Sequence, residues 1–484
     1  MQNIRLFTLS LSISVLRFLL LISLILHIFP QQGLTKTSDN ENHGVSYAII
    51  VTKAVAEDKD WFSVAQSLQR KYQEKYDAFI SSWDDSLQVT LQTNLPQYAC
   101  FIAKPEEVTR DFLKDIWNLT RSLDDDPYGD VIWGVITGYN YEEAMRLTQV
   151  SDLEVDQVVS STSILTDYFK KAVIFDEINK NHWIIKENNR KLEDRNDAPD
   201  DTTHSIAEQL NDAELFITSG HATELNWSIG YAYKNGFFVS KEGSLYGFPS
   251  NSDPFPIKSN GSKIHIAAGN CLLGHINDPH NCIALSLMRD AHVDMLIGYT
   301  VPTWYGYMGW GILDYYLEQP GRFSVAEAFF ANNQALNYLL EERRKSQKSG
   351  DSAASNLSSQ DVQGLLYDRD TVILYGDPAW HNALAPLDSG WQQSLTVSKE
   401  DSKQIWTLTI TPLKEEKTYE LLNTNGSQRS GRPIVQIFPY KIKKAQVIEG
   451  MQYNPVVTEN FILIPLTKDL PTNLSYSIKI LSED

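Results

Sequence analysis

The stretch Ile264-His265-Ile266-Ala267-Ala268-Gly269-Asn270-Cys271 decides the fold. It is a short, mostly apolar run of strand length that continues directly into a loop with a glycine and a cysteine. The stretch Leu215-Phe216-Ile217-Thr218-Ser219-Gly220-His221 has the same form, with a histidine at the corresponding place. Apolar runs of this length are typical of strands that are buried on both faces of a parallel sheet. The two stretches therefore predict an α/β fold with functional side chains at the ends of its strands.

Further runs of the same kind precede and follow this pair, with helical patterns between them. The predicted strands are Ser46–Val51, Tyr98–Ile102, 131–136, 172–175, 295–298 and 371–375. The spacing of apolar residues predicts helices over 60–78, 111–123, 284–289 and 324–344, and a helix that starts near Glu142. We expect 178–204 to be a charged loop and 346–360 to be a mobile surface loop. The pattern indicates two α/β subdomains with mostly parallel strands, at 45–150 and 151–385.

The sequence changes character near residue 386. Short runs rich in β-branched and aromatic residues follow one another, separated by turn residues, and helical spacing is rare. These runs are 405–410, 434–438, 461–464 and 476–480. The pattern predicts a β-sandwich over 386–484.

Residues 1–35 have the composition of a targeting segment. Arg5 lies in a short basic start, an apolar run extends from Phe18 to Phe29, and polar residues follow. This order is typical of a secretory signal peptide. An uncleaved N-terminal anchor is the alternative, because the apolar run can be extended back across Arg17. Both interpretations predict an exported protein that is secreted, periplasmic or at the cell surface, with membrane association only through such an anchor.

The 484 residues carry a formal net charge of −19. A nucleic-acid-binding protein normally presents a basic face, so this charge argues against a nucleic-acid partner. The hydrophobic fraction of 42% is sufficient for packed cores and excludes a disordered chain.

A cysteine and a histidine stand out as candidates for catalysis. The chain has three cysteines, Cys100, Cys271 and Cys282, and the odd number leaves at least one thiol free in an exported protein. His221 precedes Cys271 by 50 residues, and each follows a predicted buried strand. If these strands are neighbours, the imidazole can accept the thiol proton and later protonate a leaving amine. The pair therefore predicts a Cys-His dyad.

Other interpretations of the same residues stay open. His221 is alternatively a loop histidine that bonds to the backbone, and Cys271 is alternatively joined to Cys282 by a disulfide. Cys271, His275, His280 and Cys282 together offer four zinc ligands, although their spacing matches no common zinc motif.

Four blocks along the chain carry a resemblance to a known family. They are Gly220-His221-Ala222-Thr223-Glu224-Leu225-Asn226-Trp227, then Cys271 and Cys282 followed by Ala284-Leu285-Ser286-Leu287-Met288, then Trp304, and finally Tyr375-Gly376-Asp377-Pro378-Ala379. In this order they resemble the gingipain-type cysteine peptidases of the caspase–haemoglobinase clan. The resemblance covers most of the chain from about residue 45.

The resemblance implies two caspase-like α/β subdomains with mostly parallel sheets and a C-terminal immunoglobulin-like β-sandwich. It implies a cysteine endopeptidase in which Cys271 is the nucleophile and His221 is the base. The backbone N–H groups of Ala222 and Cys271 would form the oxyanion hole. Proteins or peptides would be the substrates, and catalysis would require no cofactor.

The resemblance also implies that Trp304 lines the pocket for the residue before the scissile bond. From the residues alone, Trp304 with Tyr305 and Tyr307 is equally an aromatic cluster of the core or of the protein rim.

Two positions depart from the family pattern. Ala222 stands where the family has glycine, and its Cβ costs energy if the backbone there needs a positive φ. No acid stands near Tyr139, where the family's third catalytic residue is expected. A catalytically inactive caspase-like binding scaffold is therefore an alternative function. A sortase-like transpeptidase, in which an amine replaces water, is another.

An acidic turn offers a candidate cation site. Asp124-Asp125-Asp126 with Asp130 supplies oxygen ligands of the kind that a structural calcium ion prefers. A solvated acidic turn without a metal is the alternative.

Overall fold

The computed structural model describes residues 45–188, 190–349, 357–387, 390–400, 403–413, 418–420, 426 and 428–483. The predicted signal peptide or anchor at 1–35 lies outside the described residues, as do residues 350–356 of the predicted loop at 346–360. The two ends of that loop belong instead to helices, which extend to Ser349 and start again at Ser359. None of the helices in the described ranges is both long enough and apolar enough to cross a membrane.

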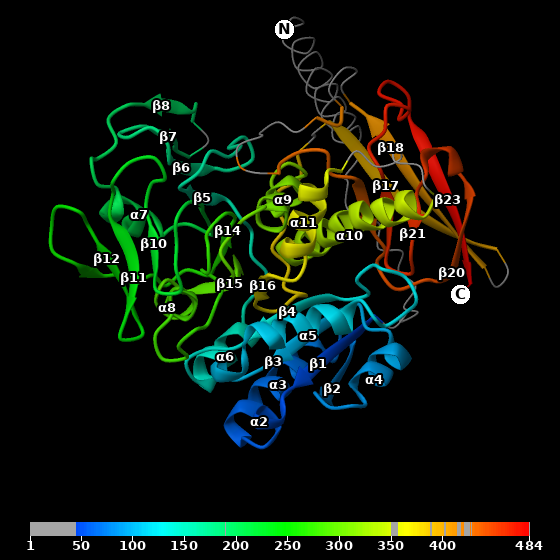
Figure 1. Ribbon diagram of the computed structural model, residues 1–484, viewed down its shortest axis with the longest axis horizontal. Helices are drawn as coiled ribbons and strands as arrows, with labels where there is room; N and C mark the ends of the chain where they lie inside the picture. The colour runs from blue at the N-terminus through cyan, green and yellow to red at the C-terminus, as the bar shows by residue number, and fades with distance from the viewer. Residues whose placement is uncertain are drawn as a thin grey trace, which may run out of the picture. The chain divides into compact units, whose positions relative to one another are not determined.

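A twelve-stranded sheet organises the first three quarters of the chain (Figure 1). Its strands are β1 (Ser46–Val51), β2 (Asp77–Ser82), β3 (Tyr98–Ile102), β4 (Ile132–Ile136), β5 (Gln157–Ser160), β6 (Lys171–Phe175), β7 (Trp183–Lys186), β8 (Glu193–Arg195), β9 (Leu215–Thr218), β14 (Lys263–Ala267), β15 (Val293–Tyr299) and β16 (Val372–Tyr375). Their order across the sheet is β2-β1-β3-β4-β16-β15-β14-β9-β5-β6-β7-β8. The strands of both predicted α/β subdomains thus belong to one mostly parallel sheet.

Strand direction divides this sheet into two halves. β16 is parallel to β4 but antiparallel to β15, so the two halves run in opposite directions. The carboxyl ends of one group of parallel strands therefore lie on the same side of the sheet; this group is β15, β14, β9, β5 and β6. The carboxyl ends of β1, β3 and β4 lie on the opposite side. Residues that follow β15, β14, β9, β5 and β6 are therefore brought together on one side of the sheet.

Helices connect and cover the strands. They are α2 (Lys53–Ala56), α3 (Lys59–Tyr72), α4 (Leu87–Asn94), α5 (Arg110–Thr120), α6 (Tyr141–Thr148), α7 (Thr203–Gln209), α8 (Ile283–Asp290), α9 (Tyr307–Tyr316), α10 (Val325–Ser349) and α11 (Ser359–Asp368), with 3-10 turns η1 (Pro105–Glu107) and η2 (Met451–Tyr453). α3 illustrates why they form. Asp58 caps its first N–H groups, and Trp61, Val64 and Leu68 form a buried stripe at helical spacing.

Three parts of the sequence prediction were wrong. The helix predicted over 60–78 ends at Tyr72, and the half-exposed edge strand β2 follows it. The segment 178–204, predicted as a charged loop, contains the antiparallel pair β7 and β8. β5 was not predicted, because it has only two apolar residues, Val158 and Val159. These strands are stabilised by their neighbours more than by their own composition.

The β7–β8 hairpin is held by a histidine between two acids. His182 Nδ1 lies 2.7 Å from Asp176 Oδ2, and its Nε2 lies 2.8 Å from Asp194 Oδ1. These hydrogen bonds, the one to Asp194 first, raise the pKa of His182.

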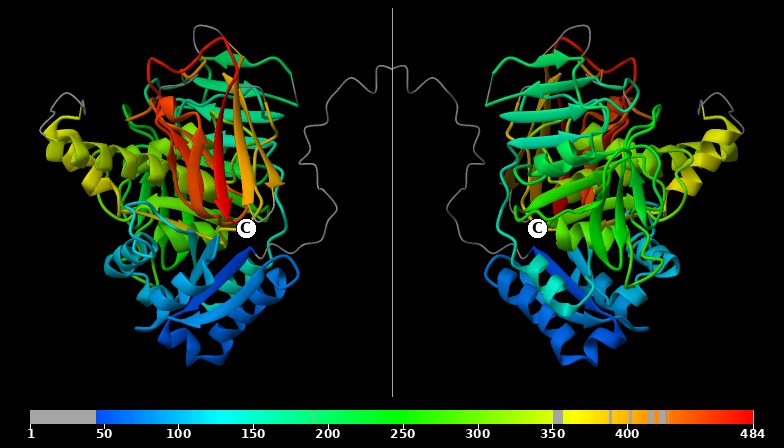
Figure 2. Two further views of the ribbon diagram at one scale, coloured as in Figure 1. Left: turned by 90° about the vertical axis from the view of Figure 1, so that its right-hand side faces the viewer. Right: turned by 90° about the vertical axis from the view of Figure 1, so that its left-hand side faces the viewer.

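The C-terminal β region (residues 390–483) contains two small antiparallel sheets, shown in orange to red in Figure 2. One comprises β17 (Trp391–Glu400), β18 (Lys403–Pro412), β23 (Tyr476–Glu483) and β20 (Lys443–Glu449), and the other β19 (Ile434–Ile437), β22 (Phe461–Ile464) and β21 (Val456–Val457). Buried side chains from both sheets, among them Trp406, Ile462 and Ile478, form one core. The predicted run of β-strands is confirmed.

The β region meets helix α9 through a buried charge cluster. The guanidinium groups of Arg429 and Arg432 both bond to the carboxylate of Asp314 on α9, the second at 2.8 Å. The Arg432 guanidinium also lies 3.5 Å from the ring centroid of Tyr307. All these side chains are buried, so the cluster is shielded from water.

Asp377 joins the two halves of the sheet. It follows β16, yet its carboxylate accepts hydrogen bonds from Tyr47 Oη at 2.8 Å and Tyr72 Oη at 2.6 Å, which belong to the first half. Lys71 Nζ lies 3.0 Å away. The Gly-Asp-Pro block thus has a structural role in this chain.

Candidate active site

The predicted dyad lies at the ends of two neighbouring strands. β9 and β14 are paired and parallel, with Thr218 opposite Ala267. His221 follows the end of β9 by three residues, and Cys271 follows the end of β14 by four. The adjacency of the two strands, on which the sequence argument depended, is confirmed. The catalytic roles of the two side chains stay predictions.

Cys271 is a free, partly exposed thiol. Its Sγ accepts a hydrogen bond from the Thr303 N–H at 3.2 Å, in the loop after β15. The next residue, Leu272, has a φ of 59°, a conformation that costs a side-chain-bearing residue about 1 kcal/mol or more. Such strain is frequent beside reactive groups.

The loop after Cys271 rests directly on β15. The Gly274 N–H donates to Tyr299 O at 2.9 Å. A Cβ on Gly274 would lie 2.6 Å from Gly298 O, so only glycine permits this approach of two backbones. Cys271 is therefore carried by a closely supported loop.

His221 is exposed and stacks on Tyr231, with ring centroids 5.1 Å apart and planes inclined by 26°. Within the described ranges, no hydrogen bond joins its imidazole to Cys271. Catalytic hydrogen bonds are often long in the absence of substrate and shorten when it binds.

Asn270 connects the loops that carry the dyad. Its Nδ2 donates to Gly220 O at 3.1 Å, and its Oδ1 accepts from Thr218 Oγ1 at 2.6 Å. Nε2 of His265 lies 2.8 Å from the same Thr218 hydroxyl, and burial lowers the pKa of His265 to about 3. Asn270 is completely buried, so these bonds hold the residues preceding His221 and Cys271 in one register.

Two backbone N–H groups are available for an oxyanion. In the part of the chain that the structure describes, neither the Ala222 N–H nor the Cys271 N–H donates a hydrogen bond. Ala222 does not have a positive φ, so its Cβ introduces no backbone strain. The departure from glycine at this position is therefore sterically harmless here.

Trp304 directly follows Thr303, whose N–H bonds to the Cys271 sulfur. It is 51% exposed, which excludes the core alternative. Its ring packs edge-to-face with Tyr367 at 5.8 Å, and Tyr367 Oη donates to Pro302 O at 2.8 Å. Trp304 and Tyr367 thus form an exposed aromatic pair, and Trp304 adjoins in sequence the residue whose N–H bonds to the sulfur.

A carboxylate that the sequence argument missed lies near His221. Glu177 follows β6, and its Oε1 accepts from Thr162 Oγ1 at 2.8 Å while its Oε2 accepts from Ser219 Oγ. Its backbone oxygen accepts the N–H of Tyr231, the residue that stacks on His221. Tyr139, near which a third residue was expected, instead donates to Cys282 O at 3.1 Å. The sequence signal that could have indicated Glu177 was its position two residues after the buried strand β6.

The disulfide alternative is wrong, because Cys271 and Cys282 are both free and Cys282 is buried. The zinc alternative also finds no support. Among the described residues, the one group of three or more potential metal ligands is Asp124, Asp130 and Glu459.

That acidic cluster corresponds only in part to the predicted turn. Ligand oxygens of Asp124, Asp130 and Glu459 lie within 4.8 Å of one another, and Asp125 and Asp126 are not in the group. Burial raises the pKa of Asp130 to about 9, with Glu459 adding to the effect and Lys441 opposing it. Burial therefore favours the protonated form of Asp130, so that the cluster carries less negative charge than three ionised carboxylates would.

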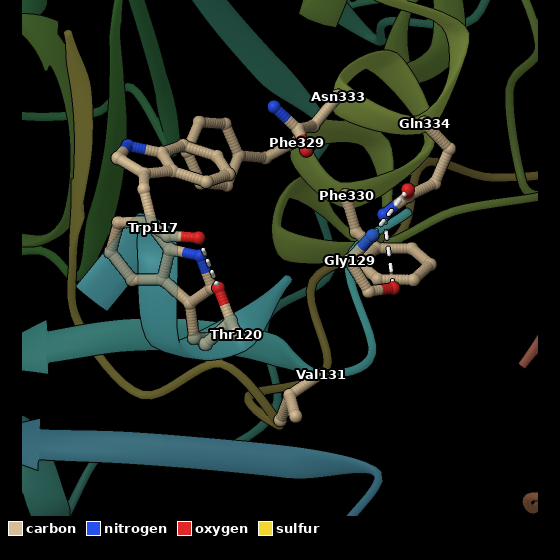
Figure 3. A pocket seen from close by; sticks show the side chains of 9 residues that line it. Trp117, Thr120, Gly129, Val131, Phe329, Phe330, Asn333 and Gln334 are labelled. Carbon is tan, nitrogen blue, oxygen red and sulfur yellow. Dashed lines mark hydrogen bonds between the residues drawn. The ribbon is translucent and has the colours of Figure 1, made fainter. Parts of the chain in front are cut away.

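A small cavity lies elsewhere, between α5, β4 and α10 (Figure 3). Its volume is about 10 Å³, and it is lined by Trp117, Phe329 and Gln334 among others. This volume accommodates at most one water molecule. No predicted site residue lines it.

Comparison of the chain with protein-family models, with curated proteins and with solved structures finds no significant match.

Proposed function

We propose that this protein is an exported cysteine endopeptidase with a caspase-like α/β core and an immunoglobulin-like β-sandwich. The observation that carries the proposal is the placement of His221 and a free, partly exposed Cys271 after two paired parallel strands. The supported loop of Cys271 and the unengaged N–H groups of Ala222 and Cys271 add to it.

The proposed reaction proceeds through an acyl-enzyme. The Cys271 sulfur attacks the scissile carbonyl carbon after His221 accepts the thiol proton. The N–H groups of Ala222 and Cys271 stabilise the negative charge on the carbonyl oxygen. His221 then protonates the leaving amine, and later deprotonates the water that hydrolyses the thioester. Trp304 and Tyr367 contact the substrate beside the cut bond.

Substitution of either dyad residue tests this function. We expect Cys271→Ala and His221→Ala each to reduce cleavage of a mixed peptide library by at least about 10³-fold, with unchanged circular dichroism. His280→Ala is the matched control, because His280 is exposed in the loop that follows Cys271. Full activity in either dyad variant would exclude the mechanism.

Thiol labelling distinguishes the enzyme from an inactive scaffold. The scaffold is the second candidate, because within the described ranges no hydrogen bond joins His221 to Cys271. Cys100 and Cys282 are buried, and burial raises the pKa of both thiols, that of Cys282 to about 12. Iodoacetamide near pH 7 should therefore modify Cys271 alone, as read by peptide mass spectrometry. An unreactive Cys271 together with no cleavage of any peptide supports the scaffold.

A further inference from the structure

An arginine without an acidic partner is bonded to the segment that leads to Trp304. Arg110, the first residue of α5, is exposed, and its Nε donates to Thr300 O at 2.8 Å. Within the described ranges it forms no ion pair, and its two Nη groups donate no hydrogen bond. The two Nη groups of a guanidinium can together bind one carboxylate. Arg110 therefore keeps an unused binding group for an anion.

The segment 299–303, to which this arginine is bonded, runs alongside the loop that carries Cys271. The Leu272 N–H donates to Val301 O at 3.1 Å. The Thr303 N–H donates to the Cys271 sulfur at 3.2 Å. Because the arginine is bonded to the same short segment, its guanidinium is held close to the proposed nucleophile.

Two side chains around Cys271 sense the charge of Arg110. Burial raises the pKa of Tyr367, and the charges of Asp368 and Cys271 add to the effect. The Arg110 guanidinium opposes it. Burial lowers the pKa of His275, and the same guanidinium adds to that shift. The hydroxyl of Tyr367 therefore lies within electrostatic reach of both the guanidinium and the sulfur.

Acidic groups of the neighbouring elements do not occupy this guanidinium. Asp361 and Asp368, the two acids of α11, accept hydrogen bonds from tyrosine hydroxyls at 2.9 and 3.0 Å. Glu224, in the loop after His221, forms no ion pair with the arginine in the part of the chain that the structure describes. A carboxylate from outside the protein is the partner that this arginine lacks.

We propose that Arg110 binds a carboxylate of the ligand at the Cys271 site, so that the peptidase prefers peptides with an acidic side chain close to the scissile bond. The preference rests on the proposed function. A cationic side chain at the same place would be repelled by the guanidinium. The exposed rings of Trp304 and Tyr367 supply apolar contact for the neighbouring part of the peptide.

Peptide pairs that differ only by Asp or Asn test this preference. With the variable residue placed in turn at each position flanking the cut bond, we expect kcat/KM at one position to be at least about 10-fold higher for the Asp peptide. Arg110→Gln should bring this ratio close to one. Arg110→Lys should retain part of it, because the charge remains but the planar fork is lost. Lys114→Gln is the matched control and should leave the ratio unchanged, because Lys114 is an exposed cation one turn further along α5.

Alkylation of Cys271 gives a second reading that needs no turnover. Iodoacetate and iodoacetamide have nearly the same shape, but only iodoacetate carries a negative charge. We expect the ratio of their rates at Cys271 to fall by about three- to tenfold in Arg110→Gln and to stay unchanged in Lys114→Gln. Mass spectrometry of the peptide that contains Cys271 measures both rates.

The outcomes separate this inference from the proposed function. Equal cleavage of the Asp and Asn peptides at every position by the wild-type protein overturns the inference and leaves the peptidase intact. An equal loss of activity on both peptides in Arg110→Gln also overturns it, because Arg110 then only supports Thr300. If no peptide is cleaved, the proposed function is overturned and the alkylation ratio decides: a fall in Arg110→Gln supports the carboxylate site, and an unchanged ratio overturns it.

Discussion

Asn270 is the residue on which the geometry of the proposed site most depends. It follows β14, and its carboxamide makes two hydrogen bonds to the end of the neighbouring strand β9, at Thr218 and at Gly220 in the loop that leads to His221; it is completely buried. Asn270→Ala removes the acceptor of the Thr218 hydroxyl and the side-chain donor to Gly220 O, so we expect the free energy of unfolding to fall by about 1–3 kcal/mol. Urea denaturation measures this change. An unchanged stability would show that water replaces the amide and that the link is dispensable.

Individual site residues differ in how far the sequence reveals them. Cys271 and His221 could be predicted, because a parallel strand delivers the residue that follows it to a known edge of the sheet. Glu177 also follows a strand, but β5 lies between β6 and β9, and β5 was not recognised. Glu459 is separated from Asp124 by more than 300 residues. No local pattern indicates a contact that depends on how two folded parts meet.

Buried ion pairs join helix α9 to the C-terminal β region. Arg432 and Asp314 are buried, and removing one partner of such a pair leaves an uncompensated charge. We therefore expect Arg432→Met to lower the free energy of unfolding by about 3–5 kcal/mol, measured by urea denaturation. Lys53→Met is the control, because Lys53 forms an exposed pair with Glu57 and should change stability by less than about 1 kcal/mol. Equal effects of the two substitutions would contradict a special role for the buried cluster.

The β7–β8 hairpin should respond to pH through His182. The folded-state pKa of His182 is raised above the unfolded value of about 6.5, so the hairpin is stabilised fully below that pH. This contribution is lost as the pH rises through the folded-state pKa. Hydrogen exchange within 183–195, corrected for intrinsic rates, should be slower at pH 6 than at pH 9. His182→Gln should remove the difference, and a difference that persists would assign it to another group.

At the level of elements, composition predicted the buried strands and failed at the edges of the sheet. β9 and β14 are buried along their whole length, and their apolar runs identify them. β2 and β7 are only partly buried, and β8 is mostly exposed, so all three carry mixed or charged sequences. Their strand conformation depends on pairing with a neighbour, which a single sequence does not display.

At the scale of the whole molecule, Asp377 links the two halves of the sheet through hydrogen bonds. Tyr47, Tyr72 and Lys71 from the first half all converge on its buried carboxylate. We expect Asp377→Ala to lower the free energy of unfolding by about 3 kcal/mol or more, because two buried hydroxyls lose their acceptor. Asp85→Asn, at an exposed position, should have little effect. A loss of activity in Asp377→Ala without any loss of stability would contradict a structural role.

The sequence predicted the α/β class and the antiparallel C-terminal region but not the continuity of the sheet. Residues 371–375 were predicted as a strand, but their place in the sheet was not. This last strand of the α/β region, β16, lies between β15 and the much earlier strand β4. β16 pairs with β4 at a single register position, Tyr375 opposite Val135. A junction this small leaves no periodic signal in the sequence.

The glycine contact between Gly274 and Gly298 bears on how such a protein can change its preferences. If Cys271 is the nucleophile, the close backbone packing at Gly274 fixes its loop, and selectivity would depend on the exposed aromatic side chains of Trp304 and Tyr367. The proposed function would then place reactivity and selectivity in separate parts of the molecule. Mutation can alter one without endangering the other.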